Sequence, residues 1–101
     1  MDIPEFFSTL EAKADPAKIE GVESSYLFDI AGEGRWLVDV HGGKLTVTEN
    51  PEAAGDVAFS MSGETFEKLT TRKQNPLTAY ATGKLKVSGD IAAAMALQKI
   101  F

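Results

Sequence analysis

The side chains able to carry out acid–base, nucleophilic or metal chemistry are few and widely separated in this chain. The sequence has one histidine, His41, and no cysteine, so thiolate catalysis and cysteine-type zinc sites are excluded. Strand-like alternation places His41 outward at a hairpin end, where a solvated imidazole is expected rather than a general base. Glu49 and Glu52 fall in a loop, without the cleft that paired acid–base carboxylates need. Gly32 and Gly34 link two strands and do not open the helix of a phosphate-binding loop.

These residues predict a protein that is not an enzyme and that holds neither a metal nor a cofactor. No serine or threonine has a neighbouring His-Asp arrangement that would activate its hydroxyl. The remaining distinctive side chains are bulky and apolar, and on the residues alone they are as expected for the filled core of a small domain. They are Tyr26, Phe28, Trp36, Phe59, Met61, Phe66, Tyr80, Met95 and Phe101.

The net charge of −5 is distributed unevenly along the chain. Residues 1–67 hold fourteen acidic and four basic side chains, whereas residues 68–88 hold five basic and no acidic side chains. The acidic body argues against nucleic acid as a partner, because basic contacts to phosphates dominate that affinity. The basic segment has two interpretations. It makes transient contact with an anionic membrane surface, where each Lys or Arg contributes about 1 kcal/mol, or its lysines keep an exposed edge strand from pairing with other chains.

The composition indicates one globular domain over residues 1–101. Hydrophobic residues make up 44% of the chain and charged residues 25%, which is typical of a folded protein rather than a disordered one. No apolar run approaches the roughly 20 residues that span a bilayer, and no basic-then-apolar leader opens the chain. We therefore expect a cytoplasmic protein.

The elements that position the side chains of the first half change in period along the chain. A helix is predicted from the capping residue Asp2 to about Ala14, and a short helical turn follows Asp15-Pro16. The spacing of apolar residues then shifts from about four to two, which predicts strands over 22–30, 35–41 and 44–48. The glycine pair 42–43 between the last two strands is a strong hairpin signal.

The second half alternates strands with helices. A fourth strand is predicted over 56–61, and a helix is predicted from Ser62 to about Thr71. A further helix begins at Asn75-Pro76, a fifth strand covers 84–88, and Asp90 opens a final helix. Strands in succession followed by helices indicate the α+β class, with the helices on one face of the sheet because the other face alternates to polar residues.

In order and spacing, the chain's motifs resemble the sterol carrier protein type 2 family of lipid-binding domains. The matching motifs are Tyr26-x-Phe28-x-Ile30, Gly34-x-Trp36-x-x-Asp39, Gly42-Gly43, Asp56-Val57-x-Phe59-x-Met61-Ser62, Phe66-x-x-Leu69, Asn75-Pro76 and Gly83-Lys84-Leu85-Lys86-Val87-x-Gly89-Asp90. The resemblance implies a five-stranded, mainly antiparallel sheet with helices covering one face and enclosing an apolar tunnel.

The resemblance also implies a non-catalytic function. An apolar lipid (a fatty acid, fatty acyl-CoA, phospholipid or sterol-like molecule) binds in the tunnel between sheet and helices and is transferred, with the final helix as a lid. The residues that the resemblance places at the lipid are Phe59, Met61, Phe66, Leu69, Leu77, Tyr80, Leu85, Val87, Ile91, Met95 and Phe101. The protein is expected as a monomer or a homodimer.

The alternative function is a protein-interaction or dimerising module of a lipid or quinone pathway. Its basis in the sequence is Leu27 and Leu37, which alternation places outward on neighbouring strands, where they would form an exposed apolar patch.

The sequence departs from the family pattern in two places. Arg72 stands where the family usually ends its middle helix with glycine, which predicts a longer helix that carries basic charge to the tunnel rim. The chain ends in Lys99-Ile100-Phe101 rather than in a Ser-Lys-Leu type of peroxisomal address. We therefore expect a small, free-standing prokaryotic member of the family.

Overall fold

The computed structural model describes residues 2–13, 15–53 and 55–92. Its elements in chain order are α1 (Ile3–Ala12), α2 (Pro16–Ile19), β1 (Ser24–Ala31), β2 (Gly34–His41), β3 (Lys44–Glu49), β4 (Val57–Ser62), α3 (Gly63–Thr70), α4 (Pro76–Ala81) and β5 (Lys86–Gly89). After β5, residues 91 and 92 are helical, and the Asp90 carboxylate accepts the Ala92 N–H at 2.9 Å. Met95 and Phe101 lie outside the described residues.

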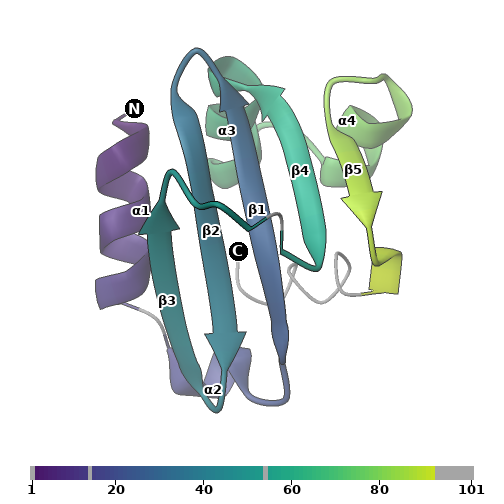
Figure 1. Cartoon of the computed structure of the whole chain (residues 1–101). Coiled ribbons are helices and arrows are strands. Elements are labelled where there is room, and N and C mark those ends of the chain that lie inside the picture. Colours follow the sequence, from purple (N-terminus) through teal and green to yellow (C-terminus); the bar gives the residue numbers. More distant parts are fainter. Residues whose placement is uncertain (1, 14, 54, 93–101) are drawn as a thin grey trace.

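The sheet has the strand order β3-β2-β1-β4-β5 (Figure 1). The pairs β1–β2, β2–β3 and β4–β5 are antiparallel, and the central pair β1–β4 is parallel. Helices α1, α3 and α4 lie on one side of the sheet in Figure 1. The predicted α+β class and mainly antiparallel sheet are therefore confirmed.

Local signals fix most element boundaries. The side chains of Asp2, Ser62 and Asn75 accept backbone N–H groups at the first turns of α1, α3 and α4. Between β2 and β3, Gly42 and Gly43 have φ values of 56° and 77°. Both are positive, as required by the tight hairpin turn that the sequence predicts. Capping and turn chemistry thus set where these elements begin and end.

The prediction that Arg72, in place of a helix-ending glycine, makes the middle helix longer is wrong. Helix α3 ends at Thr70, and Arg72 takes the left-handed conformation itself, with φ at 62°. The Lys73 N–H donates to the Lys68 carbonyl oxygen at 2.8 Å, which is the closing bond of a glycine-type helix end. These hydrogen bonds offset the cost of a left-handed non-glycine residue, about 1–2 kcal/mol. The Arg72 side chain is exposed.

An aromatic cluster fills the space between the sheet and helices α1 and α3. The ring of Phe7, which is 1% exposed, lies 4.8 Å from Trp36 and 5.4 Å from both Phe28 and Phe66. The Phe28 ring in turn lies 5.3 Å from Phe59 on β4. The core therefore runs from α1 across β2 and β1 to β4.

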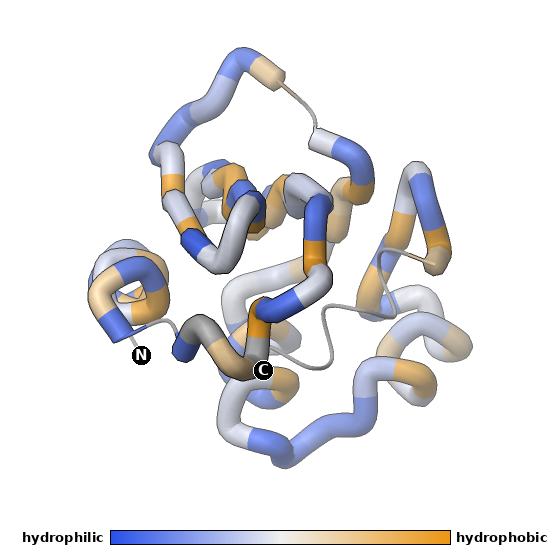
Figure 2. Tube along the Cα trace, turned by 90° about the horizontal axis from the view of Figure 1, so that it is seen from below, coloured by the Kyte–Doolittle hydropathy of each residue, from blue (hydrophilic) through white to orange (hydrophobic). Residues whose placement is uncertain are grey.

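The outer face of the sheet is crossed by the connection between β3 and β4. This connection is fixed at both ends, where Asn50 donates to the Arg35 carbonyl and Asp56 to the Ser25 carbonyl, each at 2.9 Å. Figure 2 shows it on the opposite side of the sheet from α3 and α4. A Cβ built at Gly55 would lie 2.9 Å from Leu37, and Leu27 is only 4% exposed.

The predicted exposed patch of Leu27 and Leu37 is therefore wrong. Strand alternation does place both side chains on the outer face, but the connection that reaches β4 passes over that face and covers them. Only Leu37 keeps some exposure.

Candidate functional site

The residues expected at the lipid separate into a buried and an exposed group. Phe59, Met61, Phe66 and Leu85 are buried between sheet and helices, and Leu69 and Val87 are half-buried against them. Leu77, Tyr80 and Ile91 lie at the surface, with exposed fractions of 69%, 54% and 53%. The structure thus brings six of these residues together and places three outside the buried layer.

Strand register positions the buried group. Phe59 on β4 pairs with Phe28 of β1 on one side and with Val87 of β5 on the other, so the three side chains share the helix-facing side of the sheet. Phe66 follows one turn into α3, which Ser62 caps directly after β4. The chain order β4–α3 therefore folds Phe66 back onto Phe28, with the ring centroids 6.2 Å apart.

Helix α4 presents its small residue inward and its large residues outward. Ala79 is fully buried, and its carbonyl oxygen accepts the N–H groups of Lys84 at 2.9 Å and Leu85 at 3.1 Å. Leu77 and Tyr80 share a helical face, but that face points to solvent because Ala79 occupies the inward position. The α4 side of the interior therefore receives no large side chain from α4.

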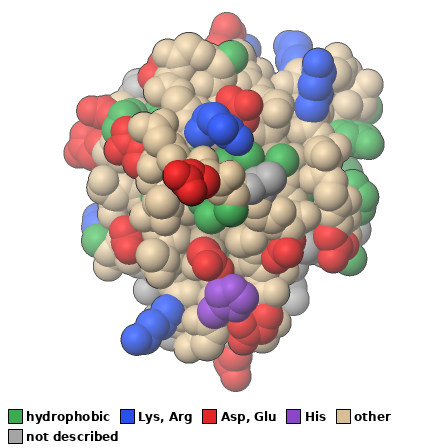
Figure 3. All heavy atoms as spheres, in the orientation of Figure 1, with side chains coloured by type: hydrophobic (Ala, Val, Ile, Leu, Met, Phe, Trp, Pro, Cys, Tyr) green, Lys and Arg blue, Asp and Glu red, His purple; other side chains and the backbone are tan. Residues whose placement is uncertain are grey.

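The surface around α4 and β5 is basic. Arg72, Lys73, Lys84 and Lys86 are all exposed, and no acidic residue occurs between positions 68 and 88. Figure 3 shows basic side chains at the upper right and hydrophobic side chains along the right edge, on the β5 side of the molecule, with acidic side chains below them and over much of the rest of that face. The exposed Leu77 and Tyr80 thus lie in the one basic segment of an acidic chain.

Tyr26 of β1 carries a polar group within the buried layer. Its side chain is 0% exposed, and its hydroxyl has no hydrogen-bond partner among the residues that the structure describes. Burial raises the pKa of the Tyr26 phenol, and the carboxylates of Asp56 and Asp90 raise it further. Ser24 is close enough to oppose this rise in pKa but makes no well-formed hydrogen bond with the phenol. Sequence reasoning counted Tyr26 only as a core residue.

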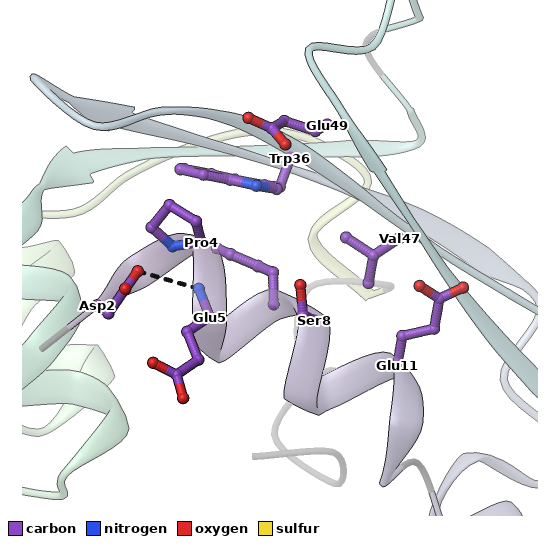
Figure 4. Close-up of a pocket in the computed structure, with 9 residues that line it drawn as sticks. Asp2, Pro4, Glu5, Ser8, Glu11, Trp36, Val47 and Glu49 are labelled. Atoms are coloured by element: carbon purple, nitrogen blue, oxygen red, sulfur yellow. Dashed lines mark hydrogen bonds between the residues drawn. The ribbon is translucent and has the colours of Figure 1, made fainter.

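Two open hollows occur elsewhere on the surface, away from the buried group. One, of about 270 Å³, lies between α1 and the β2–β3 pair (Figure 4), and its lining includes Asp2, Glu5, Glu11 and Glu49. The other, of about 480 Å³, lies between α2 and the β2–β3 turn beside Glu20 and Glu23. None of the residues expected at the lipid lines either hollow.

His41 is exposed at the β2–β3 turn, as predicted, but it is not isolated. Its Nδ1 lies 2.8 Å from a Glu23 carboxylate oxygen, and its Nε2 lies 2.8 Å from Asp39 Oδ1. The hydrogen bond with Glu23 and the charge of Asp39 raise the pKa of His41. The hydrogen bond to His41 lowers the pKa of Glu23. Sequence spacing hid this contact because Glu23 is eighteen residues away.

In the described part of the chain, no group of three His, Cys, Asp or Glu side chains is arranged to hold a metal ion. Within the same residues, no helix is both long enough and apolar enough to cross a membrane.

Comparisons with known proteins agree with this geometry. The family model of the SCP-2 sterol transfer family matches residues 5–101. Hydroxysteroid dehydrogenase-like protein 2 of Xenopus tropicalis is 34% identical over 97% of this chain and 24% of that protein. Sterol carrier protein 2 of Gallus gallus is 40% identical over 82% of this chain and 16% of that protein. The chain therefore spans no more than a quarter of these relatives.

Solved structures share the fold. The sterol carrier protein domain 2 of Helicoverpa armigera superposes with a TM-score of 0.82 at 29% identity, over 98% of this chain and 84% of that domain. Palmitated SCP2L2 of Aedes aegypti superposes with a TM-score of 0.73 at 23% identity, over 98% of this chain and 95% of that chain. At the lower identity the similarity establishes the fold alone.

Proposed function

Because this chain belongs to the SCP-2 sterol transfer family, we propose that it binds an apolar lipid under α3 and α4 and transfers it without making or breaking a covalent bond. The ligand belongs to the classes that the family resemblance implies: fatty acid, fatty acyl-CoA, phospholipid or sterol-like lipid.

The observation that carries the proposal is the composition of the buried layer beneath α4. Phe59, Leu85 and Val87 supply apolar side chains from the sheet side, whereas α4 contributes only the methyl group of Ala79. An acyl chain placed against such a layer gains about 0.8 kcal/mol per buried CH₂. A tail of about sixteen carbons therefore offers on the order of 12 kcal/mol before the ordering costs of binding.

The proposed function is non-catalytic. His41 is the one imidazole of the chain, and it faces Glu23 and Asp39 at the surface, away from the buried group around Phe59. A lipid held by apolar contacts needs no proton transfer or nucleophile. The dehydrogenase-like relatives are about four times longer than this chain, and their whole activity is not carried over to it.

We further propose that lipid exchange takes place at an anionic membrane surface. The exposed side chains of Leu77 and Tyr80 can insert among head groups while the neighbouring Lys84 and Lys86 meet anionic lipid. This role accounts for large apolar side chains at the surface of a helix whose small residue faces the core.

A displacement titration with a fluorescent fatty-acid analogue tests the lipid proposal, together with mass spectrometry of an organic extract of the purified protein. Val87 and Val47 are half-buried valines on the two opposite edge strands, so they form a matched pair. Val87→Trp should fill space at the lipid and weaken binding at least tenfold, whereas Val47→Trp should leave it unchanged. Transfer from vesicles should be faster when they contain anionic lipid.

Absence of co-purified lipid together with absence of saturable displacement would contradict the proposal. Equal loss of binding in both tryptophan variants would show that the site does not lie at the β5 side.

The alternative function, a protein-interaction module, is not favoured by the structure. Its motivating patch is covered, because Leu27 is buried beneath the β3–β4 connection. Light scattering remains the direct measurement of whether the protein is a monomer or a homodimer.

A further inference from the structure

Tyr26 places a hydroxyl in the buried layer without a partner to satisfy it. The side chain is 0% exposed, and no described residue makes a hydrogen bond with the hydroxyl. Buried polar groups in folded proteins are nearly always hydrogen-bonded, because each loses its water on burial. A phenylalanine at this position would keep the ring and avoid that loss. Among the described residues the hydroxyl therefore keeps hydrogen-bonding capacity that only Ser24 is close enough to influence.

The position of Tyr26 brings this hydroxyl to the candidate lipid site. Tyr26 pairs across the sheet with Val57 of β4, two residues before Phe59. The rings of Tyr26 and Phe59 are stacked with their centroids 6.3 Å apart. A lipid in contact with Phe59 would therefore lie beside the residue that neighbours the Tyr26 ring.

The carboxyl groups of Asp56 and Asp90 belong to the end of the sheet where Tyr26 pairs with Val57. Asp56 directly precedes Val57, and its carboxylate accepts the Ser25 N–H at 3.0 Å. Asp90 directly follows Gly89, which pairs with Val57, and the Asp90 N–H donates to the Asp56 carbonyl at 3.2 Å. Both carboxylates add to the rise in the pKa of the Tyr26 phenol, so both act on its surroundings. A further negative charge brought here would be repelled and poorly hydrated.

We propose that Tyr26 determines the specificity of the site for the polar end of the lipid, and that it favours an uncharged hydroxyl group over a carboxylate or phosphate. The phenol both donates and accepts, so it can form a hydrogen bond with an alcohol in either direction. Asp56 and Asp90 then disfavour an anionic head group. This inference rests on the proposed lipid-binding function and adds the chemical class of the head group to it.

Three ligands with the same tail test the inference: dodecan-1-ol, dodecanoate and dodecane, each competing with a fluorescent lipid analogue at pH 8. The wild-type protein should bind the alcohol more tightly than the carboxylate. Tyr26→Phe should weaken binding of the alcohol about three- to tenfold, which is the range expected for one neutral hydrogen bond. Binding of dodecane should not change.

A second measurement separates this role from a structural one. Without ligand, Tyr26→Phe should unfold at a higher temperature than the wild type, because it removes an unsatisfied buried hydroxyl. Thr65→Val is the matched control, since Thr65 is also a buried hydroxyl residue but its Oγ1 already accepts from Ser62 Oγ at 3.1 Å. That variant should lower the unfolding temperature and leave the preference among the three ligands unchanged.

The outcomes are distinguishable. If the wild type binds all three ligands and Tyr26→Phe binds the alcohol as tightly as before, the role of Tyr26 is contradicted while lipid binding stands. The same conclusion follows if the carboxylate binds more tightly than the alcohol. If the wild type binds none of the three ligands, the proposed function fails and the inference fails with it.

Discussion

The two ends of the sheet are stabilised in different ways. Where α1 and α3 cover β1 and β2, Phe7 is 1% exposed and stacks at 4.8 Å on Trp36, and other aromatic rings surround the pair. Where α4 lies beside β5, the helix buries only Ala79, and its Leu77 is 69% exposed. We call these the aromatic end and the α4 end.

This difference separates stability from binding. The aromatic end is filled by the protein's own side chains and can hold the fold together. At the α4 end the helix contributes little buried apolar surface, so a ligand or a membrane can supply apolar contacts that the chain itself does not make there. Substitutions at the aromatic end should therefore change the free energy of unfolding, and substitutions at the α4 end should change it far less.

The largest expected effect is at Phe7. Phe7→Ala should lower the free energy of unfolding by about 3–5 kcal/mol, because it leaves a cavity among rings that cannot fully collapse. Leu77→Ala is the comparison at the α4 end and should change stability by no more than about 0.5 kcal/mol. Urea unfolding followed by the fluorescence of the single tryptophan, Trp36, measures both. Equal effects would show that the two ends are packed alike.

A smaller effect, of opposite sign, is expected where α3 ends. Arg72→Gly should raise the free energy of unfolding by roughly 0.5–1 kcal/mol, because glycine adopts the left-handed conformation of residue 72 without strain. Arg72→Ala removes the same charge but keeps the Cβ, so it should bring no gain. If alanine stabilises as much as glycine, charge rather than backbone strain is responsible. Thermal unfolding of the three proteins distinguishes these cases.

The smallest effect concerns the exposed contact at His41. Because His41 is the only histidine, its ring protons report its titration directly in NMR spectra. The midpoint should lie above 6.5, since the hydrogen bond with Glu23 and the charge of Asp39 raise the pKa of His41. Glu23→Gln should bring the midpoint back toward 6.5. An unchanged midpoint in Glu23→Gln would show that the contact is not kept in solution.

The sign of the accompanying pH dependence follows from these shifts. A raised pKa means that the contribution of His41 to stability is complete below 6.5 and is lost as pH rises through the higher folded value. Glu23, whose pKa is lowered, contributes fully above 4.5 and loses its contribution as pH falls through its folded value. The contact between His41 and Glu23 therefore stabilises the folded protein most between about pH 4.5 and 6.5.

The features that the sequence predicted correctly are those set by neighbouring residues. Asp2, Ser62 and Asn75 cap helices because each lies two or three residues from the N–H that it accepts. The glycine pair 42–43 specifies its hairpin in the same local way.

The features that the sequence did not predict depend on contacts between distant segments. Helical spacing shows that Leu77 and Tyr80 share a face, but the packing of Ala79 decides that this face is turned outward. Alternation puts Leu27 on the outer face, but only the path of the β3–β4 connection shows that it is covered. The lack of a partner for the Tyr26 hydroxyl is likewise a property of its surroundings, since the residue type alone indicates a core position.

The β3–β4 connection also sets the order in which the sheet can assemble and come apart. Strands β1 to β3 are joined by tight turns, whereas the parallel β1–β4 pair closes a long loop that contains β2 and β3. Strand β5 lies at the edge of the sheet and pairs with β4 over only four residues, so it is the strand expected to open first while the aromatic end stays packed. Amide hydrogens of β5 should exchange with solvent sooner than those of β2. Such a partial opening would give a lipid a route to the interior at a lower free energy than unfolding of the whole domain.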